Sequence, residues 1–286
     1  MKRLLRFIAF AAFPLCFSAC SKNTDSAGSS AQLEFVFKFD STQQRLNNIG
    51  LPASIPADHS AQSPLFNNMS AHYVELAPTA FTPLGSGDIL YKAPEVSTGG
   101  AIAIDFSKSV MAKEGDVFLS VPISNVTSGT YQYLRVSLAY QNYNIKFNVL
   151  GANLTGTIAS FIGFNTYISS YRIKDSTVSV NANKLQGYWG FETPYSVLSG
   201  DAAATTVPNP LASTSPIPAG SCVVTGAFAT PLVIKGNETK NIRITVSLST
   251  NKSFEWKDQN RNGIYEPLGY DSVVDMGIRG LIPIVQ

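Results

Sequence analysis

The amino-acid sequence predicts an all-β protein, folded as an antiparallel β-sandwich or a barrel-like domain. Short runs of alternating apolar and polar residues recur along the chain, and turns rich in Gly, Pro and Asn separate them. After the N-terminal leader, no segment carries a sustained apolar stripe at helical spacing. Of the 286 residues, 44% are hydrophobic and only 14% are charged, which excludes a disordered, collagen-like or coiled-coil protein.

The first predicted strand, residues 33–40, shows the alternation most clearly. Leu33, Phe35, Phe37 and Phe39 fall on one face, and a period of two with aromatic residues on one side indicates a half-buried strand. Similar runs predict strands over residues 71–76, 101–106, 116–123, 131–140, 144–149, 176–180, 221–228, 242–248 and 277–285.

In residues 131–140, Leu134, Val136 and Leu138 are expected to face the core, and the opposite face is polar and aromatic. Residues 158–173 are rich in β-branched and aromatic side chains, so strand is favoured there over a helix, which stays open as the alternative.

Two long polar connections, residues 41–70 and 199–220, interrupt the strand pattern and contain several prolines. Loops of this length are functional or mobile. No internal repeat divides the remainder, and all-β folds reach this size, so residues 33–286 are expected to form a single domain.

The N-terminus has the features of a secretory leader over residues 1–19. Lys2, Arg3 and Arg6 precede an apolar run, residues 7–17, that is shorter than the roughly 20 residues needed to span a bilayer. The formal charge of +2 depends on this leader: without its three basic residues, 18 Lys and Arg face 19 Asp and Glu. The nearly neutral remainder does not indicate nucleic-acid binding.

The leader ends in Phe17-Ser18-Ala19-Cys20, followed by the polar residues of a flexible tether, so residues 20–32 are expected to link the membrane to the domain. This ending resembles the lipobox of bacterial lipoproteins, although Phe17 stands where Leu is usual. The resemblance implies cleavage before Cys20 and acylation of that residue with palmitate-type chains, which anchor a protein stably when several are present. The layout is also similar to envelope lipoproteins of Bacteroidota-like bacteria. Ser21, in place of Asp, then favours the outer membrane.

A second motif lies near the C-terminus, from Asp258 to Glu266. Asp258, Asn260 and Asn262, then Gly263, reproduce the start of a calcium loop, in which the carbonyl of Ile264 and the carboxylate of Glu266 are further oxygen ligands. The twelfth position, residue 269, is Gly rather than the Glu of an EF-hand, so a distal ligand would have to come from residue 271 or 275, both Asp. A plain Asn-Gly hairpin turn explains the same residues without a cation.

His59 and His72, with Met69 as a soft third ligand, are the candidates for a copper or zinc site. Their spacing matches no closed metal site, so polar residues without a metal are the simpler interpretation. The order of tether, early strand, long loop and late hairpin resembles, in layout only, copper-binding lipoproteins associated with methanobactin uptake.

Aromatic residues gather at Tyr188, Trp189, Phe191 and Tyr195, and again in residues 140–144. Exposed rings stack on sugars, so a glycan-binding platform is one interpretation, and a buried core cluster is the other. The lone cysteine of the domain, Cys222, lies in a β-like run and is expected to be a buried apolar residue rather than a nucleophile.

No local motif of a hydrolase, metalloprotease, nucleotide-binding or dinucleotide-binding enzyme occurs in the sequence. The sequence therefore predicts a membrane-anchored envelope lipoprotein whose β-rich domain binds a ligand, metal or partner without catalysis. A carbohydrate-binding or carbohydrate-active surface protein, the latter using paired carboxylates, and a copper-binding lipoprotein are the alternatives.

Overall fold

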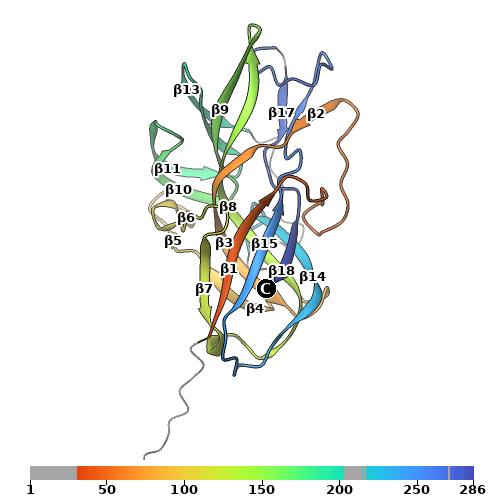
Figure 1. The fold of residues 1–286 in the computed structure, drawn as a ribbon. Coiled ribbons are helices and arrows are strands. Elements are labelled where there is room, and N and C mark those ends of the chain that lie inside the picture. The colour runs from red at the N-terminus through yellow and green to blue at the C-terminus, as the bar shows by residue number, and fades with distance from the viewer. Residues whose placement is uncertain (1–30, 203–214, 216, 270) are drawn as a thin grey trace, which may run out of the picture.

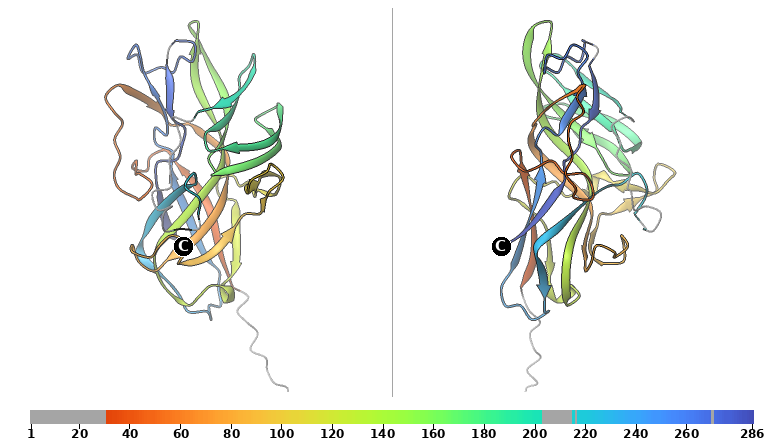
Figure 2. Two further views of the ribbon diagram at one scale, coloured as in Figure 1. Left: turned by 180° about the vertical axis from the view of Figure 1, so that it is seen from behind. Right: turned by 90° about the vertical axis from the view of Figure 1, so that its right-hand side faces the viewer.

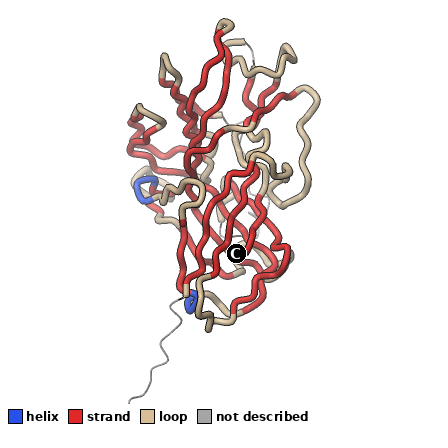
Figure 3. The backbone as a smooth tube through the Cα atoms, in the orientation of Figure 1, coloured by secondary structure: helices blue, strands red, loops and turns tan. Residues whose placement is uncertain are grey.

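The computed structural model describes residues 31–202, 215, 217–269 and 271–286, and in this part of the chain nearly all regular structure is β-strand (Figures 1 and 3). The exceptions are two single-turn 3₁₀ helices, Phe106–Lys108 and Ile123–Asn125. No helix among the described residues is long and apolar enough to cross a membrane. The predicted all-β class is confirmed.

The lower half of the molecule in Figure 1 is a sandwich of two sheets. The smaller sheet has a parallel pair at its centre, because β1 (Gln32–Asp40) runs parallel to β15 (Ile242–Ser249) and antiparallel to β7 (Val117–Pro122). Its strand order is β18 (Leu281–Val285), β15, β1 and β7.

The larger sheet is organised around one long strand, β8 (Gly129–Val149), which continues into the upper half (Figure 2). Its first half pairs with β14 (Cys222–Ile234), and its second half pairs with β9 (Ala152–Phe161). The full order of the sheet is β13 (Val197–Asp201), β12 (Tyr188–Glu192), β9, β8, β3 (Leu65–Ala77) and β4 (Asp88–Lys92), with β14 beside β8.

Two small sheets flank the upper half. One has the order β11 (Thr177–Leu185), β10 (Asn165–Arg172), β6 (Ala103–Asp105) and β5 (Glu95–Val96). The other has the order β17 (Ser272–Asp275), β16 (Phe254–Lys257) and β2 (His59–Gln62).

Two main apolar cores follow from this arrangement. The lower core fills the sandwich with the alternating side chains of β1 and the predicted inward face of β8, including Phe35, Phe37, Leu134 and Val136. Phe37 stacks on Phe118 with ring centroids 4.0 Å apart. The upper core lies between β8, β9 and β12 on one side and β16–β17 on the other, and it contains Tyr143, Ile145, Phe147, Ile158, Phe191, Phe254, Trp256 and Met276.

The structure corrects several details of the predicted strands. The runs 131–140 and 144–149 form one strand. In residues 158–173 the favoured interpretation as strand is confirmed, with the end of β9 and the whole of β10 in place of one continuous run. The face of β8 expected to be polar is also buried: the Arg135 guanidinium lies 3.8 Å from the Glu75 carboxylate, and Glu75 is fully buried. Burial on both faces removes the alternation from which strand boundaries are read.

The connection 41–70 is shorter than predicted, because β2 and the start of β3 lie inside it. These segments are polar, and backbone pairing with β16 and β8 fixes them as strands. At the other end, Gln32 belongs to β1 rather than to the tether, since it pairs with Pro122. The predicted leader, Cys20 and most of the tether lie outside the described residues, as do residues 203–214 of the second long connection.

Candidate ligand-binding site

The candidate site lies at the end of the molecule opposite the start of β1, where two hairpins and a loop meet (Figure 1). The hairpins are β8–β9 and β12–β13, and the loop, residues 258–271, connects β16 to β17. Two adjoining hollows lie here and share three lining residues, Phe147, Leu154 and Tyr265. We call them the apolar hollow, lined mainly by the two hairpins, and the polar hollow, beside Gln62 of β2.

The apolar hollow has a volume of about 580 Å³ and continues the upper core toward solvent. Strand alternation supplies its floor, because Ile145, Phe147 and Val149 face the same side of β8. Its other lining residues are Leu154, Ile158, Trp189, Phe191, Thr193, Tyr195, Ser196, Leu198, Asp201, Ala202, Phe254, Tyr265, Pro267, Leu268, Val273 and Met276.

Two glycines shape the floor and one wall of the apolar hollow. A Cβ on Gly156 would lie 2.4 Å from the Phe191 ring, and a Cβ on Gly200 would lie 3.1 Å from the Trp189 ring. The Phe191 ring therefore occupies space that only a glycine at residue 156 leaves open, and a side chain at residue 200 would press on the Trp189 ring. The position of these rings in the hollow depends on the two glycines.

The mouth of the apolar hollow carries large apolar side chains in contact with water. Tyr195 is 83% exposed, Leu268 74% and Leu198 53%. Two polar residues beside them are already engaged, since the Thr193 hydroxyl donates to the Ser196 carbonyl. The mouth is thus an apolar surface that nothing in the described part of the chain covers.

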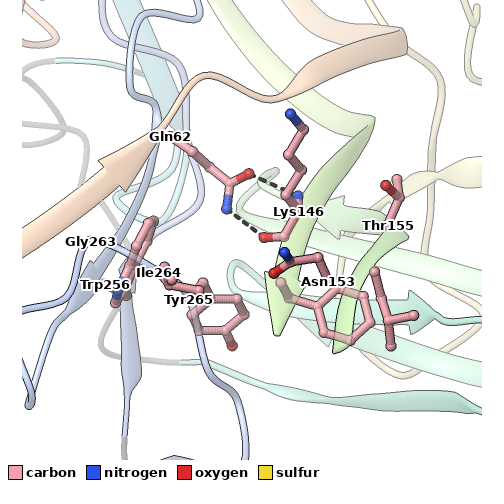
Figure 4. A pocket seen from close by; sticks show the side chains of 10 residues that line it. Gln62, Lys146, Asn153, Thr155, Trp256, Gly263, Ile264 and Tyr265 are labelled. Carbon is pink, nitrogen blue, oxygen red and sulfur yellow. Dashed lines mark hydrogen bonds between the residues drawn. The ribbon is translucent and has the colours of Figure 1, made fainter. Parts of the chain in front are cut away.

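Charged side chains are directed away from both hollows. Asp201 pairs directly with Tyr188, whose ring packs in a separate core with Phe161 and Tyr171, so the Asp201 side chain shares that opposite face. Lys146 alternates with the apolar residues of β8, and Figure 4 shows its ammonium group pointing away from Trp256 and Tyr265. Among the described residues that line the apolar hollow, Asp201 is the one charged residue, and its side chain lies on the opposite face of β13.

The polar hollow has a volume of about 570 Å³ and is lined by Gln62, Lys146, Phe147, Asn153, Leu154, Thr155, Trp256, Gly263, Ile264 and Tyr265 (Figure 4). The Gln62 amide closes its edge: it donates to the Lys146 carbonyl at 2.7 Å and accepts from the Lys146 N–H at 2.8 Å. Asn148 donates to the Asn153 side-chain oxygen at 2.9 Å, and the Asn153 NH₂ has no acceptor among the described residues.

Tyr265, from the loop between β16 and β17, is the loop's part of the wall shared by the two hollows. The Asn148 N–H donates to the Tyr265 carbonyl at 2.8 Å and fixes the loop to β8. The Tyr265 ring packs against Phe254 and Trp256, with centroid distances of 5.1 and 5.6 Å, and its burial raises the pKa of the Tyr265 hydroxyl to about 12. The conformation of this loop therefore sets the shape of both hollows.

The predicted calcium ligands lie in this loop, and hydrogen bonds within the loop engage them. Asp258 accepts from the N–H groups of Asn262 and Gly263 and from the Ser60 hydroxyl. The amides of Asn260 and Asn262 both donate to one oxygen of Glu266, at 2.7 and 2.9 Å. Burial by itself raises the pKa of Asp258, but the bonds that it accepts outweigh burial, so this pKa lies below its usual value.

The two proposed distal ligands lie in different surroundings. Asp271 belongs to the loop and accepts from the N–H groups of Gln259 and Glu266. Asp275 instead lies in a buried ionic cluster that also contains Arg45, Glu255 and Arg279. Its carboxylate is 2.6 Å from the Arg279 guanidinium. No group of three or more His, Cys, Asp and Glu side chains suited to a metal is found among the described residues. Calcium binding by Asp258, Asn260, Asn262, Ile264 and Glu266 stays a prediction.

His59, His72 and Met69 occupy three different environments. The His59 Nδ1 lies 2.6 Å from a Glu255 oxygen in the ionic cluster. His72 is fully buried and bonds Glu95 through Nε2, and burial lowers its pKa. Met69 is fully buried in the lower core.

The aromatic cluster divides between core and site. Tyr188 is buried in a separate core, whereas Trp189, Tyr195 and the buried Phe191 line the apolar hollow. In residues 140–144 the rings of Tyr140 and Tyr143 are buried, so this stretch presents no exposed aromatic platform. Cys222 is buried as predicted, and burial raises the pKa of its thiol to about 12.

Sequence reasoning found parts of this site but not the site itself. The sequence predicts a calcium site in the loop and a glycan platform at Trp189, whereas Ile145, Phe147 and Leu154 look like ordinary strand residues. The available signal was the pair of glycines on strands, which often marks a close approach.

Comparison with known proteins adds no assignment: no protein-family model, curated protein or solved structure matches the chain.

Proposed function

We propose that this chain is a lipid-anchored envelope protein whose β domain binds a small, largely apolar ligand in the apolar hollow. The observation that carries the proposal is an uncharged hollow of about 580 Å³ whose mouth exposes Tyr195, Leu198 and Leu268. Ligand pockets commonly have volumes of about 300–1,000 Å³ and mostly apolar walls. Exposed apolar surface around such a pocket indicates something that covers it.

The position of the site agrees with an anchor at Cys20. The described chain enters β1 at the end of the molecule opposite the hollows (Figure 1). An acylated N-terminus would therefore hold the other end of the domain near the bilayer and leave the hollows facing away. Several acyl chains on one residue are needed for stable anchoring.

Two measurements test this function. The neutral dye N-phenyl-1-naphthylamine, which fluoresces in apolar surroundings, should bind saturably to the domain at one site. Val273→Trp, which fills the hollow, should abolish that signal, because Val273 lines the apolar hollow and is only partly buried. Retained dye binding in a folded variant would contradict the site.

Metabolic labelling with a fatty acid tests the anchor: equal labelling of the natural chain and Cys20→Ser would refute it.

A glycan-binding function is the second candidate, and the polar hollow favours it. Tyr265 offers an aromatic ring there, and the NH₂ of Asn153, which no described residue accepts from, offers a donor for a hydroxyl. Trp256 contributes little stacking surface, since it is 1% exposed. Oligosaccharides that quench tryptophan emission in the natural chain but not in Tyr265→Ala would support this function, and the absence of any response would exclude it.

A further inference from the structure

The chemistry and shape of the two hollows specify the ligand more closely than "apolar". This step depends on the proposed function, because it names the ligand class of the same site. Three observations bear on it: the uncharged interior, the elongated floor and the polar hollow that adjoins the apolar one.

The floor of the apolar hollow extends along a hairpin. Leu154 and Ile158 on β9 both line it, and four residues of extended strand span about 13 Å. On β8 the lining side chains run from Ile145 through Val149, which covers a similar length. A hollow that follows strands in this way fits a long, thin group better than a single compact ring.

The interior gives a charged group no partner. The register places the exposed Asp201 side chain on the face of β13 opposite to the hollow, and the Lys146 ammonium group points away from the rings of the polar hollow. Desolvation of an unpaired charge is costly, so the part of the ligand that enters must be uncharged. An aliphatic chain meets both requirements, of shape and of charge.

The ligand must also carry a polar end. Past the shared residues Phe147, Leu154 and Tyr265, the lining adds the amides of Gln62 and Asn153, beside Trp256 and Ile264. We infer that the site binds the aliphatic chain of a single-chain amphiphile, with the chain in the apolar hollow and the polar head in or beside the polar hollow. A fatty acid and an alkyl glycoside share this chemistry and differ only in the head.

The experiment is competition against N-phenyl-1-naphthylamine by two series of compounds, fatty acids and alkyl maltosides, with chains of 8 to 16 carbons and below their micelle concentrations. Burial of one CH₂ contributes about 0.8 kcal/mol, so affinity should rise about fourfold per added CH₂ and level off once the hollow is full. The series with the tighter binding identifies the head.

Leu268→Glu provides the variant, because Leu268 lines the mouth, is 74% exposed and can change without disturbing the core. Leu185→Glu is the matched control: Leu185 is 68% exposed on β11 and lines neither hollow. We expect Leu268→Glu to weaken binding of the longest chains at least tenfold and Leu185→Glu to leave it unchanged.

The outcomes separate this inference from the function on which it depends. Two results would overturn the assignment of an amphiphile and leave the ligand-binding function standing. One is displacement of the dye to the same extent by all chain lengths. The other is displacement by compact aromatic compounds as effectively as by long chains. Equal loss of long-chain binding in Leu268→Glu and Leu185→Glu would also overturn the assignment of an amphiphile. Failure of the dye to bind at all would refute the proposed function itself.

Discussion

The buried ionic cluster around Glu255 gives a quantitative prediction about stability. Glu255 is 5% exposed and lies on β16, next to Trp256 of the site. Its carboxylate pairs with Arg45 at 2.8 Å and Arg279 at 3.3 Å and accepts from His59 at 2.6 Å. Arg45 comes from the long connection between β1 and β2, so the cluster ties that connection to the β2–β16 sheet.

We expect Glu255→Gln to reduce the free energy of unfolding by about 3 kcal/mol. Removing one partner of a buried pair costs about 3–5 kcal/mol, because the other charge stays buried without compensation. The lower end applies here, since Arg279 keeps Asp275 at 2.6 Å and Arg45 still donates to the Asn251 carbonyl at 3.2 Å. For a domain of this size the loss corresponds to a fall in Tm of about 6–12 °C.

Urea unfolding followed by circular dichroism measures the loss, and a matched pair on the surface provides the control. Glu34 pairs with Arg243 at 2.8 Å, as closely as Glu255 pairs with Arg45, but the Arg243 side chain is 48% exposed. Glu34→Gln should therefore cost at most about 1 kcal/mol. A loss below 1 kcal/mol for Glu255→Gln, or similar losses for both variants, would refute the argument from burial.

Four further predictions concern the rest of the domain. Burial lowers the pKa of His72 below its unfolded value of about 6.5. The stabilisation that depends on neutral His72 is therefore fully present above that pH and is lost as pH falls. His72→Phe should reduce the difference between the free energies of unfolding at pH 7 and pH 5, measured by urea titration. Gly156→Ala should cost about 1–3 kcal/mol and weaken dye binding, because its Cβ would displace Phe191. Leu150→Asn should raise Tm slightly, since Leu150 has a φ of 52° and is 97% exposed at a hairpin turn that favours Asn. Millimolar calcium should raise the Tm of the natural chain but not of Asp258→Asn; a response shared by both would exclude the loop.

The sequence alone predicted the features that depend on local spacing. Alternation in residues 33–40 and the turns rich in Gly and Asn indicated strands, because side chains of a strand alternate between faces whatever the rest of the fold. The burial of Cys222 followed from its β-like surroundings in the same way. The leader and Cys20 are also local patterns, and their acylation remains a prediction.

Tertiary structure decided the rest, because it depends on pairings between distant segments. The ion pair of Arg45 and Glu255 joins residues 210 positions apart. The apolar hollow exists only because β8–β9, β12–β13 and the loop after β16 meet at one end, and strand register then turns Asp201 and Lys146 away from its interior. Periodicity identifies which residues share a face of a strand, but only the pairing of strands determines what that face encloses.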